Sequence, residues 1–357
     1  MRLFKMTEIQ LHSKLLNWFE NNKRDLPWRN QKDPYKIWLS EVILQQTRVS
    51  QGIQYYYNFC EAFPTVQDLA KANEEEILKL WQGLGYYSRA RNLHFAAKQI
   101  GKSTFPNTYK DLLLLKGVGE YTAGAIASIA FGEAVTLVDG NVYRLFARLF
   151  GIDTPIDSSK GKKEFSELAK SLLYKKDPGT WNQALMEFGA LHCKPKNPHC
   201  ETCILKSYCK AFENSLQKKL PYKKGKTKQQ TLYLSYAYFV DGDYTYIIQR
   251  PKNGIWGGLF EFPRIESKQI ITPEIFEKEL CNLFPKLSDF EILNISKSFK
   301  HILSHRIFHV NFLEIKVNQQ IQADSFIRIP LSELNKYPVS RLMEKYIQGH
   351  LTSSNII

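Results

Sequence analysis

The sequence predicts an all-α domain over residues 1–213, followed by a smaller α+β domain over residues 231–357. Apolar residues recur at helical spacing through the first part, and no convincing strand precedes residue 230. Beyond that point apolar residues alternate, which is typical of strands. Residues 214–230 are rich in lysine and poor in apolar residues, as a linker is. A chain of 357 residues is long enough for about two domains.

The basic charge of the chain is concentrated in its first part. The net charge is +14. Residues 1–213 hold 29 Lys and Arg against 22 Asp and Glu, residues 214–230 hold 6 lysines and no acid, and residues 231–357 hold 14 against 13. A localised excess points to a polyanion as partner, although a solvated basic surface would have the same composition.

Targeting signals are not evident. Residues 1–5 lack the pattern of a secretory signal peptide, and no apolar run approaches the roughly 20 residues that span a bilayer. The hydrophobic and charged fractions, 43% and 24%, are those of a globular chain rather than a disordered one. We therefore expect a soluble cytoplasmic protein, associated with the nucleoid if the source is bacterial.

Two features stand out among the first predicted helices. Residues 8–22 and 34–47 have helical spacing. Between them Trp28, with Arg29 beside it, offers the flat face and polar neighbour that a flipped base requires, although a core position explains the tryptophan as well. Glu41 lies in an apolar part of the second helix. Burial would raise its pKa and keep it a proton donor near neutral pH; an exposed glutamate is the alternative.

Two Gly-x-Gly turns lead into predicted helices. In one, Gly117 and Gly119 would take positive φ and leave backbone N–H groups free at the next helix start. Such a turn binds one DNA phosphate without reading sequence, although it is also common in plain helix packing. The other turn, at 83–85, opens a helix that bears tyrosines for stacking. Asp139 begins a further helix, either as an N-cap or as an acid that faces the same DNA strand.

Four of the 6 cysteines lie within 17 residues, at Cys193, Cys200, Cys203 and Cys209. In a cytosolic chain this clustering favours a metal over disulfides. Four thiolates in one loop bind either an iron–sulfur cubane or a tetrahedral zinc, and the spacing excludes neither. The nearby His192 and His199 are not needed as ligands, because four cysteines fill the coordination sphere.

The second domain has its own pattern of strands and helices. Alternating apolar residues predict strands at 232–238, 244–249 and 308–312, and Thr272 with Pro273 marks the start of a helix.

Together these motifs resemble the MutY-type adenine DNA glycosylases of the helix-hairpin-helix superfamily, over nearly the whole chain. The segments that carry the resemblance are residues 26–29, 38–47, 83–87, 117–119, 138–142, the four-cysteine loop and residues 255–263. The resemblance implies removal of adenine mispaired with 8-oxoguanine or guanine in double-stranded DNA, which leaves an abasic site. It also implies a [4Fe-4S] cluster on the cysteine loop, and we expect a monomer.

The resemblance further implies roles for single residues. Glu41 matches the general acid that protonates N7 of adenine, and Asp139 matches the carboxylate that stabilises the sugar cation, a division of labour known from glycoside cleavage. Tyr121 and Asn141 match residues that support this pair by hydrogen bonds. Residues that match the base pocket and DNA contacts are Trp28, Arg29, Gln46, Tyr86, Gly117, Gly119, Leu303, Ser304 and His305. Those at positions 46 and 86 match residues inserted into the opened duplex.

Position 121 separates this family from its relatives. Endonuclease III-like enzymes carry a lysine there, which attacks the sugar as a Schiff-base nucleophile. Tyr121 cannot form an imine, so we expect a monofunctional glycosylase. The alternatives are a glycosylase/lyase of the endonuclease III type and a non-catalytic, metal-stabilised DNA-binding protein in which Glu41 and Asp139 are only structural.

Two positions depart from the family pattern. Lys116 stands where the hairpin usually has proline, which loosens the turn and adds a cation near the phosphate. Leu303 replaces the phenylalanine of the Phe-Ser-His loop that reads the lesion. Ser304 and His305 keep its hydrogen-bonding groups, and leucine still allows wedging.

The second domain also resembles the Nudix fold, whose pyrophosphatases need a glutamate six residues after a glycine and a helix with further glutamates. Phe260, Pro263 and Arg264 stand six residues after the three glycines of this segment, and no such helix follows. We therefore expect a binding module without hydrolase activity.

Overall fold

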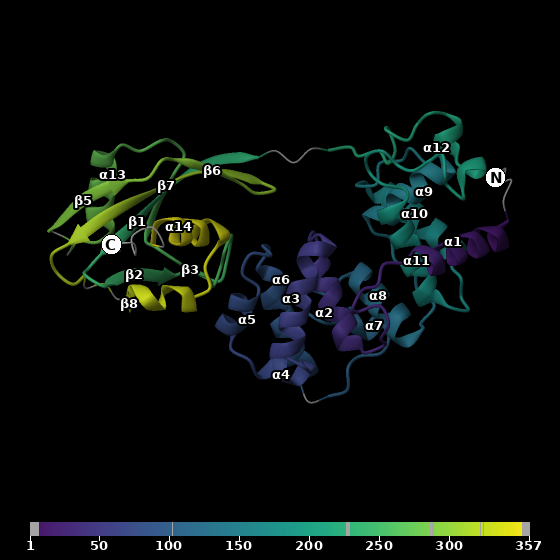
Figure 1. Cartoon of the computed structure of the whole chain (residues 1–357), viewed down its shortest axis with the longest axis horizontal. Helices are drawn as coiled ribbons and strands as arrows, with labels where there is room; N and C mark the ends of the chain where they lie inside the picture. The colour runs from purple at the N-terminus through teal and green to yellow at the C-terminus, as the bar shows by residue number, and fades with distance from the viewer. Residues whose placement is uncertain are drawn as a thin grey trace. The chain divides into compact units, whose positions relative to one another are not determined.

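The structure, a computed structural model, describes residues 7–101, 103–225, 229–285, 287, 289–321, 323 and 325–351. These fall into two compact units. The helical unit comprises the described residues of 1–71 and 92–225, and the sheet unit those of 72–91 and 226–357. The all-α part followed by an α+β part confirms the predicted fold class (Figure 1).

The helical unit is built from α-helices joined by short turns. Its helices are α1 (Glu8–Asn22), α2 (Pro34–Leu44), α3 (Val49–Ala62), α4 (Val66–Lys71), the larger part of α6 (Ser88–Ile100), α7 (Tyr109–Leu112), α8 (Glu120–Phe131), α9 (Gly140–Phe150), α10 (Ser159–Ser171), α11 (Pro178–Leu191) and α12 (Lys210–Glu213), with the short 3₁₀ helix η1 (Lys206–Tyr208). Helix α11 packs against α1, α8 and α9. Apolar residues of α1, α9, α10 and α11 form one hydrophobic core cluster.

Local sequence explains where the first helices begin and end. Helix α1 starts at a capping box in which Thr7 and Gln10 bond each other's backbone N–H. Helix α2 starts at Pro34, after Asp33 as the N-cap. The predicted extension of α2 to residue 47 is wrong: the helix ends at Leu44, because Gln46 takes a left-handed conformation with φ 57° that cannot continue it.

Much of the predicted linker at 214–230 is packed on the helical unit. Leu220 is buried, and its carbonyl accepts from Nε of Arg148 at 3.1 Å. The carboxylate of Asp157 accepts from the backbone N–H groups of Lys224 and Gly225. Residues 226–228 lie outside the described part, and strand β1 already begins at Gln230.

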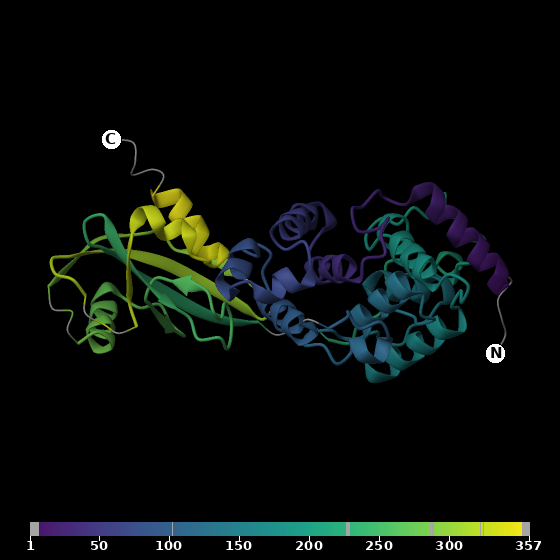
Figure 2. The same cartoon turned by 90° about the horizontal axis from the view of Figure 1, so that it is seen from below.

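The sheet unit confirms the predicted strands and helix of the second domain. Its elements are α5 (Glu74–Leu80), β1 (Gln230–Val240), β2 (Tyr244–Gln249), β3 (Phe260–Glu261), β4 (Arg264–Ser267), α13 (Pro273–Leu283), β5 (Phe290–Ile295), β6 (Phe299–Ile302), β7 (Arg306–Val317), β8 (Ile327–Pro330), the 3₁₀ helix η2 (Leu331–Lys336) and α14 (Arg341–Leu351). The larger sheet has the order β4-β1-β7-β5, with β6 also on β7; β1 and β7 are parallel. Figure 2 shows α13 and α14 on opposite faces of this sheet.

Residues 72–91 belong to the sheet unit, although the sequence places them in the first domain. Their side chains bond the C-terminal part of the chain: Gln82 Nε2 donates to Glu344 Oε1 at 3.1 Å, and the Tyr87 hydroxyl donates to the Val339 carbonyl at 3.3 Å. Arg91 donates to the carbonyl of Gly257.

None of the described helices has an apolar stretch long enough to cross a membrane.

The approach of α11 to α8 depends on a residue without a side chain. A Cβ added at Gly179 would lie 2.6 Å from the Ser128 carbonyl oxygen and 2.9 Å from Cα of Ile129. We expect Gly179→Ala to lower the stability of the helical unit by about 1–3 kcal/mol, as overpacking against backbone does. Urea unfolding followed by far-ultraviolet circular dichroism measures this. Gly140→Ala is the control, because a Cβ there meets open space, and equal midpoints for the two variants would contradict the packing argument.

Candidate active site

A cavity of about 940 Å³ in the helical unit brings the predicted catalytic residues together. Glu41 comes from α2, Tyr121 from the first turn of α8, and Asp139 with Asn141 from the start of α9. These segments are far apart in sequence, and tertiary packing brings them together: α2 packs against α8, and both α8 and α9 pack against α11. The other residues that line the cavity include Trp28, Arg29, Met186 and Glu187.

Glu41 faces the cavity from an otherwise buried helix. Its neighbours Ser40 and Val42 are 1% and 5% exposed, and the Glu41 carboxyl itself is only partly accessible. Burial raises the pKa of Glu41 to about 7, an effect that the nearby Tyr121 hydroxyl partly opposes and the Asp139 charge reinforces. Near neutral pH this carboxyl is therefore both a proton donor and a proton acceptor.

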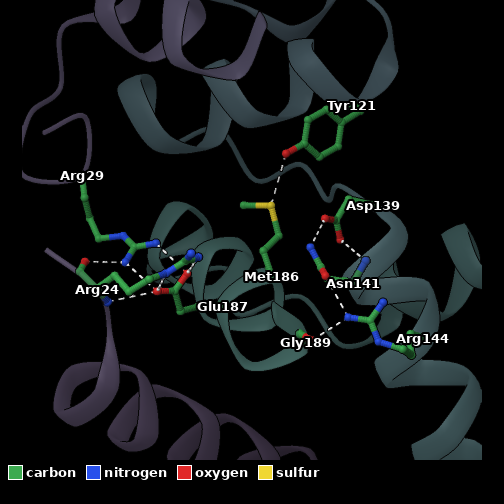
Figure 3. A network of polar contacts seen from close by, with 9 residues as sticks. All are labelled: Arg24, Arg29, Tyr121, Asp139, Asn141, Arg144, Met186, Glu187 and Gly189. Carbon is green, nitrogen blue, oxygen red and sulfur yellow. Dashed lines mark hydrogen bonds and ion pairs between the residues drawn. The ribbon is translucent and has the colours of Figure 1, made fainter. Parts of the chain in front are cut away.

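Asp139 caps α9 and faces the same cavity (Figure 3). Its Oδ1 accepts from the backbone N–H groups of Asn141 at 2.9 Å and Val142 at 2.8 Å, and its Oδ2 accepts from Nδ2 of Asn141 at 2.6 Å. Burial raises the pKa of Asp139, while these bonds lower it by favouring the carboxylate. The N-cap and cavity-facing interpretations therefore both hold.

Tyr121 lies between the two acids and the opposite wall. Its hydroxyl donates to Sδ of Met186 at 3.3 Å (Figure 3). Burial and the two neighbouring carboxylates raise the pKa of Tyr121 well above its ordinary value. The phenol therefore stays protonated and remains a hydrogen-bond donor within the cavity.

A buried arginine connects Asp139 to the cysteine loop. Nη2 of Arg144 donates to Oδ1 of Asn141 at 2.8 Å and to the Gly189 carbonyl at 2.6 Å, and its Nε donates to the Cys193 carbonyl at 2.7 Å. A Cβ at Gly189 would lie 2.7 Å from Cβ of Asn141, so only glycine allows α11 to approach this closely. Figure 3 shows Asn141 between Asp139 and Arg144. Because Arg144 also bonds the Cys193 carbonyl, the amide that bonds Asp139 is connected through this arginine to the cysteine loop.

The prediction omits Glu187, a charged residue of the cavity wall. Glu187, on α11, is 2% exposed and bonds the guanidinium groups of Arg24 and Arg29 (Figure 3). Burial raises the pKa of Glu187, but the bonds from Arg24 and Arg29 outweigh it and lower the value to about 2. Its place among the apolar residues of 184–188 is the signal that could have identified it, since the same reasoning identified Glu41.

Trp28 and Arg29, which the sequence analysis assigns to the base pocket, both line the cavity. Trp28 is 9% exposed, and its ring packs edge-on against Tyr56. Arg29 lines the same wall, but its guanidinium is held by Glu187 and by the Arg24 carbonyl, with the ring of Phe19 beneath it.

The hairpin turn between α7 and α8 agrees with the prediction at one glycine only. Gly117 has φ 79°, and a Cβ there would lie 2.6 Å from Cβ of Asn92. Gly119 is the N-cap of α8 with φ −95°, so the expected positive φ is wrong at this position, where the backbone is extended and any residue would fit.

The predicted DNA-inserting residues share a strained backbone. Gln46 in the helical unit and Tyr86 in the sheet unit have φ of 57° and 48°, and both side chains are exposed. Left-handed conformations of bulky residues are uncommon and concentrate at functional sites. In the sheet unit, Arg89 stacks its guanidinium 5.0 Å from the Trp81 ring and 5.8 Å from the Tyr86 ring, and it donates to the Gly85 carbonyl.

The predicted lesion-reading loop lies at the tip between β6 and β7. Together with the turn at 83–87 it lines a cavity of about 630 Å³ within the sheet unit. The hydroxyl groups of Tyr86 and Ser304 are hydrogen-bonded, which joins two motifs more than two hundred residues apart. Ser304 and His305 are exposed, and Leu303 is partly buried.

The four cysteines of the loop line one small cavity beside α9 and α11. Among the described residues, no three side chains of His, Cys, Asp or Glu are grouped closely enough to hold a single metal ion. Burial raises the pKa of Cys203 to about 12, so four thiolates need cationic metal to be stable there. Nη1 of Arg148 lies 3.4 Å from Sγ of Cys193, which adds a cation beside the sulfurs. The donor set and the cavity suit a polynuclear cluster.

Three segments of the chain match known protein families. Residues 39–171 match the HhH-GPD superfamily of base excision DNA repair proteins, and residues 193–209, which begin and end on cysteines of the loop, match the iron–sulfur binding domain of endonuclease III. Residues 235–349 match the NUDIX domain. The loop therefore belongs to a [4Fe-4S] protein, in which Cys193, Cys200, Cys203 and Cys209 would hold the cluster.

Individual relatives extend over most of the chain. An adenine DNA glycosylase of Buchnera aphidicola subsp. Baizongia pistaciae is 36% identical over 324 residues, which cover 88% of each chain. The human adenine DNA glycosylase is 44% identical over 218 residues, or 58% of this chain and 40% of the human protein. The structure of a thermostable thymine-DNA glycosylase, 30% identical, covers 58% of this chain and 97% of that chain with a TM-score of 0.54. The chain belongs to the adenine DNA glycosylase family, a group of N-glycosidic hydrolases within the HhH-GPD superfamily of base-excision repair enzymes.

Proposed function

We propose that this enzyme hydrolyses the N-glycosidic bond of adenine mispaired with 8-oxoguanine or guanine in duplex DNA, as a monofunctional glycosylase that leaves an abasic site. The observation that carries the proposal is the shared cavity of Glu41, Tyr121 and Asp139. The pKa of Glu41 is about 7, and the carboxylate of Asp139 accepts three hydrogen bonds. At about 940 Å³ the cavity has ample room for a flipped nucleoside.

Glu41 acts as the general acid. Protonation of adenine N7 by its carboxyl turns the base into a leaving group, so that the C1′–N9 bond breaks with its electron pair going to the base. The pKa of about 7 keeps a large fraction of Glu41 protonated at neutral pH, which an ordinary glutamate could not provide. Water then adds at C1′, and the proton it releases restores the acid.

Asp139 stabilises the sugar cation that develops while the bond breaks. Its three hydrogen-bond donors fix the carboxylate before the reaction, so little reorganisation is needed as positive charge appears. Tyr121 donates a hydrogen bond within the same cavity and cannot form an imine. The cluster, when bound, holds the cysteine loop, and through it Arg144 and Asn141 keep their orientation toward Asp139.

The other residues support DNA binding. Trp28 and Arg29 form the wall against which the flipped base lies, and Gly117 and Gly119 expose the turn that binds a phosphate. Gln46 and Tyr86 insert into the opened duplex from strained backbone positions. The tip at Leu303, Ser304 and His305 reads the base opposite adenine.

Exchange of either acid for its amide separates binding from cleavage. We expect Glu41→Gln to lower single-turnover adenine release by about 10²–10⁴-fold and Asp139→Asn by about 10²–10³-fold, because each removes one term of transition-state stabilisation. Adenine release from an 8-oxoguanine:adenine duplex, followed by alkali, measures this, while fluorescence anisotropy should show duplex affinity close to that of the wild type.

The same reaction run with borohydride distinguishes the lyase alternative. A monofunctional enzyme gives no efficient covalent DNA adduct, whereas an imine intermediate would be trapped. Unchanged turnover in Glu41→Gln would remove Glu41 from its role as the acid.

The rate should depend on pH through both acids. Glu41 works in its protonated form, so the single-turnover rate is expected to fall about tenfold per pH unit above its pKa of about 7. Asp139 works in its ionised form, and its raised pKa places the acidic limb above that of an ordinary aspartate. Rates at saturating enzyme from pH 5 to 9 test this, with duplex affinity at each pH as the control; a rate that stays constant up to pH 9 would refute the assignment.

Selectivity for the opposing base should depend on the β6–β7 tip. Ser304→Ala removes one hydroxyl from the cavity and the bond to Tyr86, so we expect the preference for 8-oxoguanine over guanine to fall by up to about tenfold, the effect of one lost hydrogen bond. Single-turnover rates on the two mispairs give the ratio. Ser325→Ala, an exposed serine outside this cavity, is the control and should leave the ratio unchanged. An equal loss on both substrates would assign Ser304 to general binding instead.

A further inference from the structure

The turn that precedes α8 is fastened to α6 by one side chain. Oε1 of Gln99 accepts from the backbone N–H of Lys116 at 2.7 Å, and Nε2 of Gln99 donates to the Leu114 carbonyl at 3.4 Å. One glutamine therefore bonds the backbone at two positions of the turn, 15 and 17 residues away in sequence.

The backbone N–H of Lys116 differs from those of its neighbours in the turn, because its acceptor is a side chain. The N–H groups of Leu114, Leu115 and Val118 each bond a carbonyl three residues earlier. In the described part of the chain, the N–H of Lys116 has Gln99 as its acceptor instead. The contact is specific to this residue, because a proline at 116 would have no N–H to donate.

Lys116 itself is placed where a cation is useful. Its side chain is exposed, and no acid is paired with it among the residues that the structure describes. Glu120, exposed in the first turn of α8, puts a negative charge beside the same turn and opposes the binding of an anion there. A lysine at 116 compensates for that charge and contributes the counterion release on which duplex affinity depends.

We propose that Gln99 is a positioning residue for DNA binding, which fixes the turn so that the Lys116 ammonium contacts a phosphate of the bound duplex. The inference rests on the proposed function, in which this turn contacts the DNA backbone. It goes further in two ways. It assigns the phosphate contact to the Lys116 ammonium, and it assigns the positioning of the turn to Gln99 of α6.

Two matched backgrounds isolate the hydrogen bond from the charge. Lys116→Gln loses the charge and keeps the N–H, whereas Lys116→Pro loses both. We expect Gln99→Ala to weaken binding of an undamaged duplex about two- to fivefold in the wild type, the effect of one modest hydrogen bond. It should have little effect in Lys116→Gln, which leaves no ammonium to position, or in Lys116→Pro, which also lacks the N–H. Lys116→Gln should also reduce the slope of log affinity against log salt by about 1.

Amide hydrogen exchange on the free protein provides the second readout. Exchange of the Lys116 amide is expected to be several-fold faster in Gln99→Ala than in the wild type, and this comparison needs no proline variant. An effect of Gln99→Ala in Lys116→Gln as large as in the wild type, an unchanged salt slope, or unchanged exchange at residue 116 would each overturn the proposal. None of these measurements involves adenine release, so their failure is distinguishable from failure of the proposed activity.

Discussion

The hydrogen bonds of the buried Arg144 guanidinium support two parts of the structure, the Asp139 side of the cavity and the cysteine loop. The guanidinium donates to the side chain that bonds Asp139 and to the carbonyl of the first loop cysteine. A charge so deeply buried is tolerated only when its donors are paired, and here the acceptors are an amide and backbone carbonyls, with no carboxylate bonded directly. The hydrogen bonds of Arg144 therefore fix the positions of Asn141, Gly189 and Cys193 relative to one another. The acid, the helix start and the metal loop are held as one piece.

The two acids of the cavity illustrate how environment sets chemistry. Glu41 projects from the middle of a helix, where every backbone N–H is already bonded, so little offsets its desolvation. Asp139 stands at a helix start, where free N–H groups converge on it. Both carboxyls face the same cavity. Burial dominates the pKa of Glu41 and favours its protonated form, whereas hydrogen bonds to Asp139 favour its ionised form.

Local sequence predicts some features of the cavity and of the helices, but not the contacts between distant residues or the backbone strain. Glu41 and Asp139 could be named as candidates because an acid in an apolar helix and an acid before a helix are local patterns, but their roles were implied only by the resemblance to the family. The pairing of Arg29 with Glu187 could not be predicted, since the partners are 158 residues apart and no local pattern connects one with the other. Apolar spacing predicted that α2 continues to residue 47, but the left-handed conformation of Gln46 ends the helix earlier. Hydrophobic periodicity carries no information about such backbone strain. Gly119 looked like Gly117 in sequence, and only the fold distinguishes the glycine that needs positive φ.

The assignment of residues 72–91 to the sheet unit has a consequence for connectivity. The polypeptide passes between the units at 71–72, 91–92 and 225–226, so three covalent links join them where a simple two-domain chain has one. One proteolytic cut after residue 225 would leave the halves tethered. A fragment that began at residue 231 would lack Gln82, Tyr87 and Arg91, and would expose backbone groups that these side chains now satisfy. The sheet unit looks like an independent domain, but residues 72–91, which lie within the sequence of the helical unit, form part of it.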